Sequence, residues 1–166
     1  MRPPRRSREG PEDPENPQQI RAVAVALLAR REHSIRELKQ KLARRGYAAD
    51  ACDAVIEDLE RRGLISEARF VESFVSHRST RGQGPVRIRA ELRQLDVGDE
   101  LVDPVLDSGD VDWCELASAV RRRRFGQALP RDFAERAKQA RFLQYRGFTQ
   151  EQIRAALAGD YDESNP

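Results

Sequence analysis

The chain has 166 residues, of which 39% are apolar and only 6% aromatic, so any core is lean and mainly aliphatic. Basic and acidic side chains number 30 and 28, a net charge of +2, so the placement of charge is more informative than its sum. Two cysteines without paired spacing argue against a disulfide framework, and no apolar run approaches the roughly 20 residues of a membrane span.

Capping signals and apolar spacing predict a first three-helix unit over residues 18–65. Asn16 followed by Pro17 is typical of an N-cap and a first helical position, and apolar residues follow at helical spacing. Ser34 begins a capping box that opens a second helix, and Gly46 ends it. A third helix then carries apolar residues on one side and stops at another glycine.

A second unit is predicted over residues 66–110 by the same signals. Ser66 begins another capping pattern, and the helix that follows carries phenylalanine and valine on one side. We interpret Gly82 to Gly84 as a turn joining two helices, where a partner backbone could approach closely. Pro85 begins the next helix. A short apolar helix closes the unit.

A third unit is predicted over residues 111–158. Trp113 belongs to its first helix, Pro130 opens the second helix, which is expected to run to Tyr145, and Thr149 begins a capping box for the last helix. The pattern contains no sustained alternation of apolar and polar residues, so strands are not expected.

Both ends of the chain have compositions that cannot build a core. Residues 1–17 are rich in Pro, Arg and Glu and hold no large apolar side chain beyond the first methionine, and residues 159–166 are acidic. Segments of this kind bury too little apolar surface to offset the entropy of ordering, so we predict disordered tails. The basic N-terminus has no apolar stretch behind it and is not expected to be a secretory signal. Together these features favour a cytoplasmic protein.

The three predicted units repeat with a period of 50 and 51 residues when Arg45-Gly46-Tyr47, Leu95-Asp96-Val97 and Arg146-Gly147-Phe148 are aligned. Apolar residues recur five positions before, five after and nine after the last residue of each triplet. These positions are Leu42, Leu92 and Leu143, then Cys52, Val102 and Ile153, then Ile56, Leu106 and Leu157. The repeat predicts an all-α fold, an elongated array of three tandem three-helix repeats with about nine helices.

Charge follows the same repeat. Residues 30–46, 78–93 and 121–146 carry net charges of +5, +4 and +7, whereas residues 50–72 and 96–115 carry −4 and −8. Basic middle helices therefore alternate with acidic segments, and the array can present a basic stripe to a polyanion or to an acidic protein groove. The alternative is a solvated helical surface balanced by local salt bridges.

Several segments within residues 19–158 resemble the RecX family of RecA modulators. The triplet Leu95-Asp96-Val97 departs from the family's Arg-Gly-hydrophobic pattern, which predicts a less tight turn there. The segments that carry the resemblance are Ile35 to Leu42, Arg45-Gly46-Tyr47, Leu59 to Val71, Phe74-Val75, Arg78, Arg81-Gly82-Gln83-Gly84-Pro85, Ile88, Glu91-Leu92, Arg141-Phe142-Leu143, Arg146-Gly147-Phe148 and Ile153.

The resemblance implies a monomeric regulatory protein that binds the RecA filament and DNA, single-stranded or double-stranded, weakly and without sequence preference. Family members occupy the groove of the RecA–DNA filament and suppress ATP hydrolysis, strand exchange and co-protease function. DNA repair, recombination and the SOS response are the processes implied. The alternative is a helical DNA-binding protein that acts alone through a basic stripe on phosphate; such binding would fall steeply with salt.

No catalytic set, metal-ligand spacing or cofactor motif is visible in the sequence, so we expect neither an enzyme nor a cofactor. His33 and His77 are expected on the surface and Cys52 in the core, whereas Cys114 could be either. Four consecutive arginines on a helix cover all its sides, so at least one of Arg121 to Arg124 must pack against the body. The candidate residues for binding the partner or DNA are Arg44, Arg45, Arg78, Arg81, Arg87, Arg89, Arg93, Arg121, Arg122, Arg123, Arg124, Arg141 and Arg146.

Overall fold

A computed structural model describes residues 10–158, which form nine α-helices and no strand, so the all-α prediction is confirmed for this part of the chain. The described helices include none that is long and apolar enough to cross a membrane. The predicted tails fall partly on residues 1–9 and 159–166, which lie outside the described residues. The chain divides into two compact units, Met1–Phe70 and Val71–Pro166.

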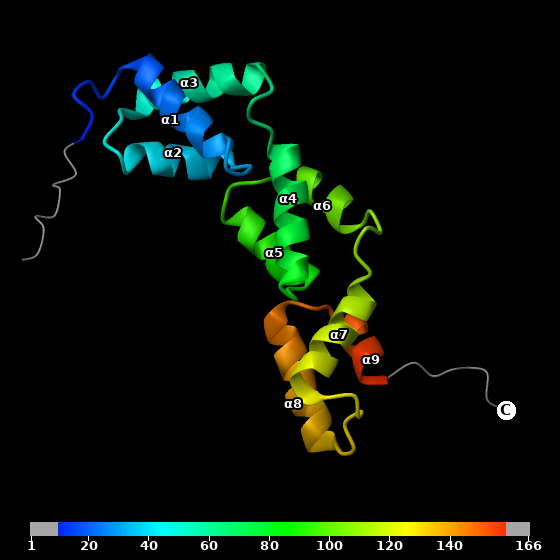
Figure 1. The fold of residues 1–166 in the computed structure, drawn as a ribbon. Helices are drawn as coiled ribbons and strands as arrows, with labels where there is room; N and C mark the ends of the chain where they lie inside the picture. The colour runs from blue at the N-terminus through cyan, green and yellow to red at the C-terminus, as the bar shows by residue number, and fades with distance from the viewer. Residues whose placement is uncertain (1–9, 159–166) are drawn as a thin grey trace, which may run out of the picture. The chain divides into compact units, whose positions relative to one another are not determined.

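The first unit contains three helices that pack on one another: α1 (Pro17–Leu28), α2 (Ile35–Ala43) and α3 (Ala49–Arg61) (Figure 1). Each helix contributes aliphatic residues at helical spacing, and these meet in one buried cluster. The cluster consists of Ile20, Ala24, Leu27, Leu38, Leu42, Cys52, Val55, Ile56, Leu59 and Ile65.

The helices of this unit begin where the capping signals predict. The Asn16 side chain accepts hydrogen bonds from the backbone N–H groups of Gln18 and Gln19, at 3.0 and 3.1 Å. At α2, Ser34 Oγ accepts from Glu37 N at 3.1 Å, and Glu37 Oε2 accepts from Ser34 N at 3.4 Å, a complete capping box. These bonds satisfy N–H groups that have no partner within the helix.

Residues 10–16 differ from the predicted tail because they lie on the first unit. The backbone N–H of Ala48, the N-cap residue of α3, donates to the carbonyl oxygen of Pro14 at 2.9 Å. Ala48 has no side-chain acceptor of its own for the helix end. The proline-rich segment therefore orders through backbone hydrogen bonding, which its lack of apolar side chains did not indicate.

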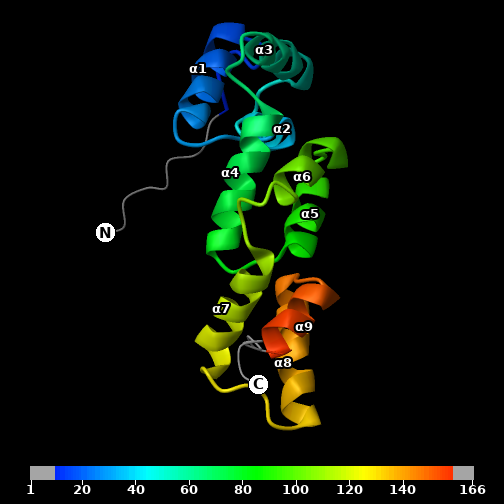
Figure 2. The ribbon, with the colours of Figure 1, turned by 90° about the vertical axis from the view of Figure 1, so that its right-hand side faces the viewer.

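The second unit contains two groups of helices (Figure 2). Helix α5 packs on α6, and α7 packs on both α8 and α9. Helix α4 begins in the first unit, and the division between the units falls inside it. The helix bounds are Glu67–Thr80 for α4, Pro85–Arg93 for α5, Asp99–Leu106 for α6, Trp113–Phe125 for α7, Phe133–Arg146 for α8 and Gln150–Ala158 for α9. The bounds of the three predicted repeats stay a prediction.

Helix α8 begins at Phe133, three residues later than the predicted start at Pro130. Asp132 is the N-cap residue, and its carboxylate accepts from Glu135 N at 2.8 Å, while Glu135 Oε2 accepts from Arg131 N at 3.1 Å. Aspartate and glutamate at this spacing satisfy the free N–H groups of the first turn. The predicted start at Pro130 was therefore too early, because Asp132 provides the cap of this helix.

The predicted repeat register is confirmed in the core. All nine register positions are buried, and none is more than 4% exposed. They are Leu42, Leu92, Leu143, Cys52, Val102, Ile153, Ile56, Leu106 and Leu157. Because each predicted unit buries the same three positions, the period reflects three similar small cores.

The turn within each repeat closes with the same backbone hydrogen bond. The donor N–H groups and acceptor oxygens are Tyr47 and Leu42 at 3.3 Å, Val97 and Leu92 at 3.2 Å, and Phe148 and Leu143 at 3.2 Å. Gly46 and Gly147 both have φ of +92°, and Asp96 takes the same left-handed region with φ of +59°. The prediction of a less tight second turn was therefore wrong: aspartate tolerates this conformation better than most residues and preserves the bond.

Candidate functional site

The acidic segment of the second repeat neutralises two of the thirteen candidate arginines. Arg89 lies 2.7 Å from an oxygen of Asp103, and Arg93 lies 2.6 Å from an oxygen of Asp99. The hydrogen bond from Arg93 lowers the pKa of the Asp99 carboxyl. At these two positions the alternation of charge along the chain becomes local salt bridging between α5 and α6.

Glu91 on α5 lies between two further candidates. Arg78 Nη2 is 3.0 Å from Glu91 Oε2, and Arg87 Nε is 3.0 Å from Glu91 Oε1. The Gln83 amide, 8% exposed, reaches the same carboxylate at 3.5 Å. Arg78 also lies over the Phe74 ring, 4.7 Å from its centroid. Two guanidinium groups share one carboxylate, so this cluster keeps a net positive charge.

The glycine-rich turn before α5 packs against the turn that follows α8. Gly84 N donates to the Arg146 carbonyl at 2.9 Å, and Val86 N donates to the Gly147 carbonyl at 3.0 Å. The Arg146 guanidinium donates to the Arg81 carbonyl at 3.3 Å. We call this contact the seam. The expected close approach of a partner backbone does occur at this turn, but the partner is the third repeat of the same chain.

The seam requires glycine at two positions. A Cβ atom at Gly84 would overlap with the carbonyl group of Gly147, and a Cβ atom at Gly147 would overlap with the backbone and Cβ of Arg87. The two backbones can approach only because neither residue has a side chain. The sequence shows a glycine-containing turn at each of these two places, but no local pattern indicates that the two turns are in contact.

Arg121, the first of four consecutive arginines on α7, lies in the interior and is 3% exposed. Its guanidinium donates to the carbonyl oxygens of Ala128 at 2.9 Å and Gln127 at 3.2 Å, and to Gln139 Oε1 at 3.4 Å. Burial lowers its pKa. Arg121 is therefore the packed member of the run that the sequence predicted. Its hydrogen bonds fix the loop between α7 and α8, and its guanidinium does not reach the protein surface.

The other three arginines of the run differ in their surroundings. Arg122 forms a salt bridge with Glu115, which lies about two turns earlier on the same face of α7. Arg123 and Arg124 are exposed. Arg124 lies over the Phe125 ring, 5.6 Å from its centroid. An aromatic ring orients a guanidinium without cancelling its charge, so Arg124 remains available to an anion.

A pair of packed aromatic rings positions two arginine side chains, one from α7 and one from α8, by cation–π contacts. Phe125 and Phe142 pack edge to face, with centroids 5.3 Å apart and an interplanar angle of 88°. Arg146 lies over the Phe142 ring at 5.5 Å, as Arg124 lies over Phe125. The edge-to-face pair links α7 to α8, so these two cations are positioned by the core of the third repeat.

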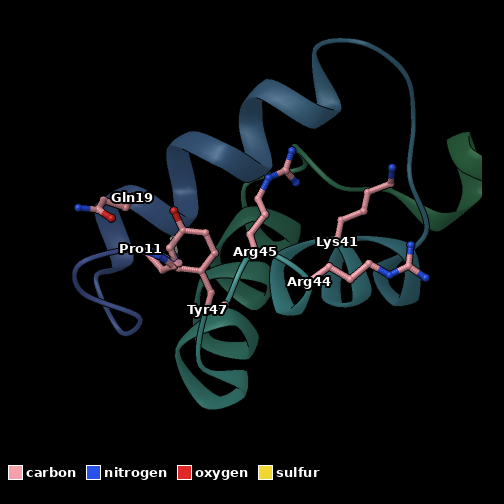
Figure 3. Close-up of a pocket in the computed structure, with 8 residues that line it drawn as sticks. Pro11, Gln19, Lys41, Arg44, Arg45 and Tyr47 are labelled. Carbon is pink, nitrogen blue, oxygen red and sulfur yellow. The ribbon is translucent and has the colours of Figure 1, made fainter. Parts of the chain in front are cut away.

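The first unit carries a basic pocket at the C-terminal end of α2 (Figure 3). Its volume is about 720 Å³, and no carboxylate lines it. Figure 3 shows three cationic side chains extending from α2 and the following turn, with Tyr47 beside Pro11. The lining residues are Gly10, Pro11, Gln19, Lys41, Arg44, Arg45, Gly46 and Tyr47.

The structure thus divides the thirteen candidates into three groups. Five are paired with a carboxylate, and Arg121 is buried. Seven make no salt bridge with any carboxylate in residues 10–158. These seven are Arg44, Arg45, Arg81, Arg123, Arg124, Arg141 and Arg146. Their role in binding stays a prediction, and we refer to them as the unpaired arginines.

His33 corrects the expectation that both histidines are on the surface. It is 2% exposed, and its Nδ1 lies 2.9 Å from the Arg31 carbonyl oxygen. Burial lowers the pKa of this histidine. His77 is exposed, as expected; Cys52 is buried and Cys114 exposed. Within the described part of the chain, no three His, Cys, Asp or Glu residues form a group that could hold a metal ion.

Three similar helical units, two of which have an arginine in the turn, define a class, the tandem three-helix-repeat proteins with a basic surface. The chain matches three family models in order: the first, second and third three-helix domains of RecX, over residues 21–59, 66–106 and 110–157. The chain belongs to the RecX family.

Curated relatives agree with this assignment. The regulatory protein RecX of Halorhodospira halophila is 53% identical over 149 residues, covering 89% of this chain and 92% of the relative. The regulatory protein RecX of Pseudomonas savastanoi pv. phaseolicola is 44% identical over 140 residues, covering 84% of this chain and 90% of the relative.

Solved structures show the same fold. A crystal structure of a regulatory protein RecX aligns with a TM-score of 0.74 and 19% identity, over 86% of this chain and 73% of the other. The crystal structure of RecX from Lactobacillus salivarius aligns with a TM-score of 0.71 and 18% identity, over 86% of this chain and 94% of the other. At this level of identity the likeness concerns the fold alone.

Proposed function

We propose that this protein is a non-enzymatic regulator that binds RecA and its DNA filament and inhibits the ATPase, strand-exchange and co-protease activities of RecA. In this role it acts as a monomer in the cytoplasm and modulates recombination, DNA repair and the SOS response. The observation that carries the proposal is the match of all three RecX domains, in order, along residues 21–157. Relatives with the same arrangement are named regulatory proteins.

The distribution of paired and unpaired arginines supports a binding role. The unpaired arginines have cationic groups that no described carboxylate neutralises, and four of them extend from α7 and α8 of the third repeat. Guanidinium groups suit this task because their planar donor set matches carboxylate and phosphate oxygens. An acidic protein surface and a DNA backbone both present such oxygens.

The direct test is the DNA-dependent ATPase of RecA. We expect the purified full-length chain to slow ATP hydrolysis by RecA on single-stranded DNA at substoichiometric or near-stoichiometric ratios. Nucleotide hydrolysis without added DNA serves as the control for non-specific effects. An unchanged rate at every ratio, including an excess of this protein, would contradict the proposal.

A residue-level test uses the two kinds of arginine. Replacement of Arg123 and Arg124 together by Gln should raise the concentration needed for half inhibition, since both are exposed and make no described salt bridge. The matched control replaces Arg89 and Arg93 together by Gln, because these two arginines are already paired with Asp103 and Asp99. Folding of each variant is checked by circular dichroism. Equal effects of the two changes would remove the α7 arginines from the binding surface.

The second candidate function is DNA binding without RecA, and the basic pocket of the first unit favours it, since three cations there face no lining carboxylate. In that case a gel-shift series should show binding that falls steeply with salt and does not change when RecA is added. The leading proposal instead expects only weak binding to DNA alone, seen at low salt, and retention on DNA at moderate salt only in the presence of RecA.

A further inference from the structure

Tyr145, in the last turn of α8, exposes 79% of its surface. Aromatic rings are usually buried because they contribute large apolar area to a core. No hydrogen bond joins the Tyr145 hydroxyl to any residue in the described range. One face of the ring is occupied by Arg87, whose Cζ lies 5.8 Å from the ring centroid.

The face of α8 around Tyr145 is basic, whereas Arg87 on α5 is paired with Glu91. Lys138 and Arg141 precede it by seven and four positions, so all three side chains lie on one face of α8. Lys138 and Arg141 are both exposed. Residues 136–150 contain no aspartate or glutamate, so this stretch of the chain supplies no compensating negative charge.

The seam completes this surface with residues of the second repeat. The hydrogen bond from Val86 N to the Gly147 carbonyl, at 3.0 Å, places the start of α5 beside the end of α8. Val86 is 49% exposed there, next to Arg87. An apolar side chain, a guanidinium and an aromatic ring from sequence positions nearly 60 residues apart thus form one surface.

We propose that Val86, Arg87, Arg141 and Tyr145 form a stacking platform for an unpaired base of single-stranded DNA. The base stacks on the ring face of Tyr145 opposite Arg87, and Arg141 and Lys138 contact the adjoining phosphates. The inference rests on the proposed function, because it assigns a DNA-contacting surface to a protein proposed to act on the RecA–DNA filament.

The chemistry of the platform favours a nucleic acid strand over an acidic peptide. An exposed ring beside several cations can use both parts of a single strand, the π-face of a base and the charge of the backbone. A peptide carboxylate would engage the cations but leave the ring with no matched partner. A duplex keeps its bases stacked inside, so it can use only the cations.

The test is fluorescence anisotropy of a labelled oligothymidine strand and of a mixed-sequence duplex of equal length, each titrated with the full chain. Tyr145→Ala should weaken binding of the single strand about tenfold and leave binding of the duplex unchanged. Tyr145→Phe, which keeps the ring, should restore binding. Phe133→Ala is the matched control, since Phe133 is 86% exposed on the same helix but about three turns away.

A salt series separates the ring from the cations. Arg141→Gln should weaken both ligands and make the dependence of affinity on salt shallower, whereas Tyr145→Ala should lower affinity without changing that slope. Equal loss for single strand and duplex in Tyr145→Ala, or no loss for either, would overturn the proposal.

The RecA ATPase assay distinguishes this inference from the proposed function. If Tyr145→Ala binds the oligothymidine normally but no longer inhibits RecA, the ring contacts protein and the platform is refuted while the regulatory function stands. If the strand binds through Tyr145 but the wild-type chain never inhibits RecA, the platform stands and the regulatory function fails.

Discussion

The turns Arg45-Gly46-Tyr47 and Arg146-Gly147-Phe148 have the same local structure but different surroundings. In both, glycine takes φ of +92° and the third residue donates to a leucine carbonyl five positions earlier. Gly46 is exposed, and the closest neighbour of an added Cβ would be Pro11 at 3.1 Å. Gly147 is buried in the seam against Arg87.

The difference shows that one local motif serves two purposes. In the first unit the turn ends a helix beside Pro11, and its arginine extends into a basic pocket. In the second unit the same turn also docks a neighbouring repeat, and its arginine donates to the Arg81 carbonyl. A substitution that acts through local strain should therefore lower the free energy of unfolding by similar amounts in both turns. A substitution that acts through packing should lower it by different amounts.

Alanine in place of the two glycines should give the largest contrast. Gly46→Ala should cost about 1–2 kcal/mol, the strain of the left-handed conformation. Gly147→Ala should cost about 1–3 kcal/mol more, because its Cβ also overlaps with Arg87. Hydrogen exchange of the α5 and α8 backbones measures the loss at the seam. Gly63→Ala controls for strain, since Gly63 has φ of +70°, lies in a turn closed by the same kind of hydrogen bond (Leu64 N to the Leu59 carbonyl) and has no neighbour within 4 Å of an added Cβ. Equal losses at Gly46 and Gly147 would contradict the docking role.

The arginines of the two turns should contribute differently to the free energy of unfolding. Arg146→Gln should destabilise the second unit by about 0.5–1 kcal/mol, because it removes the contact with the Phe142 ring as well as the hydrogen bond to Arg81. Arg45→Gln should change stability by less than about 0.5 kcal/mol. Urea unfolding followed by circular dichroism provides the comparison. A larger loss for Arg45 would mean that its charge has a structural role.

The turn of the second repeat has Asp96 where the other two turns have glycine, so it tests how much the left-handed conformation costs when the residue has a side chain. Asp96→Gly should stabilise the protein slightly, by about 0.5 kcal/mol, because relief of the left-handed strain exceeds the added entropy of the unfolded chain. Differential scanning calorimetry of the variant and the wild type measures the change. A fall in the unfolding temperature would show that the aspartate side chain stabilises this turn by more than the strain it introduces.

Acidification should affect the first unit, which contains the buried His33. Burial lowers the pKa of His33 below its usual value of 6.5, so the unfolded chain takes up the proton first. The stabilisation associated with the neutral ring is present above pH 6.5 and is lost as the pH falls from there to the lowered pKa. Unfolding curves between about pH 7.5 and 5.5 should show this small loss. His33→Gln should flatten the dependence, and His77→Gln should not.

Most of the fold could be predicted because its signals are local. Asn16 and Ser34 cap helices that begin next to them, and the leucines before each turn recur with the repeat. The error at the start of α8 was also local in origin, because Asp132 and not Pro130 caps this helix. The burial of His33 could not be predicted because the polar loop between α1 and α2 gives no sign that one of its side chains is buried.

The candidate surface was only partly accessible from the sequence. Clusters of arginine were evident, but charge counting could not tell that Arg93 is paired with Asp99 or that Arg121 is buried. The sequence pattern did not indicate Tyr145 as a site residue, since a tyrosine at a helix end usually packs against the core. Its exposure became evident only when the position of its helix was known.

The helices, their caps, the 50-residue period and the turns follow from the sequence alone, because the interactions responsible lie within about five residues along the chain. The packing of the helices sets which arginines are neutralised, which arginine is buried, and where the turns at Gly84 and Gly147 meet. These outcomes depend on contacts across many residues, as between Arg81 and Arg146, which are 65 positions apart. Such contacts require packed helices to bring the groups together, and no spacing in the sequence encodes them directly.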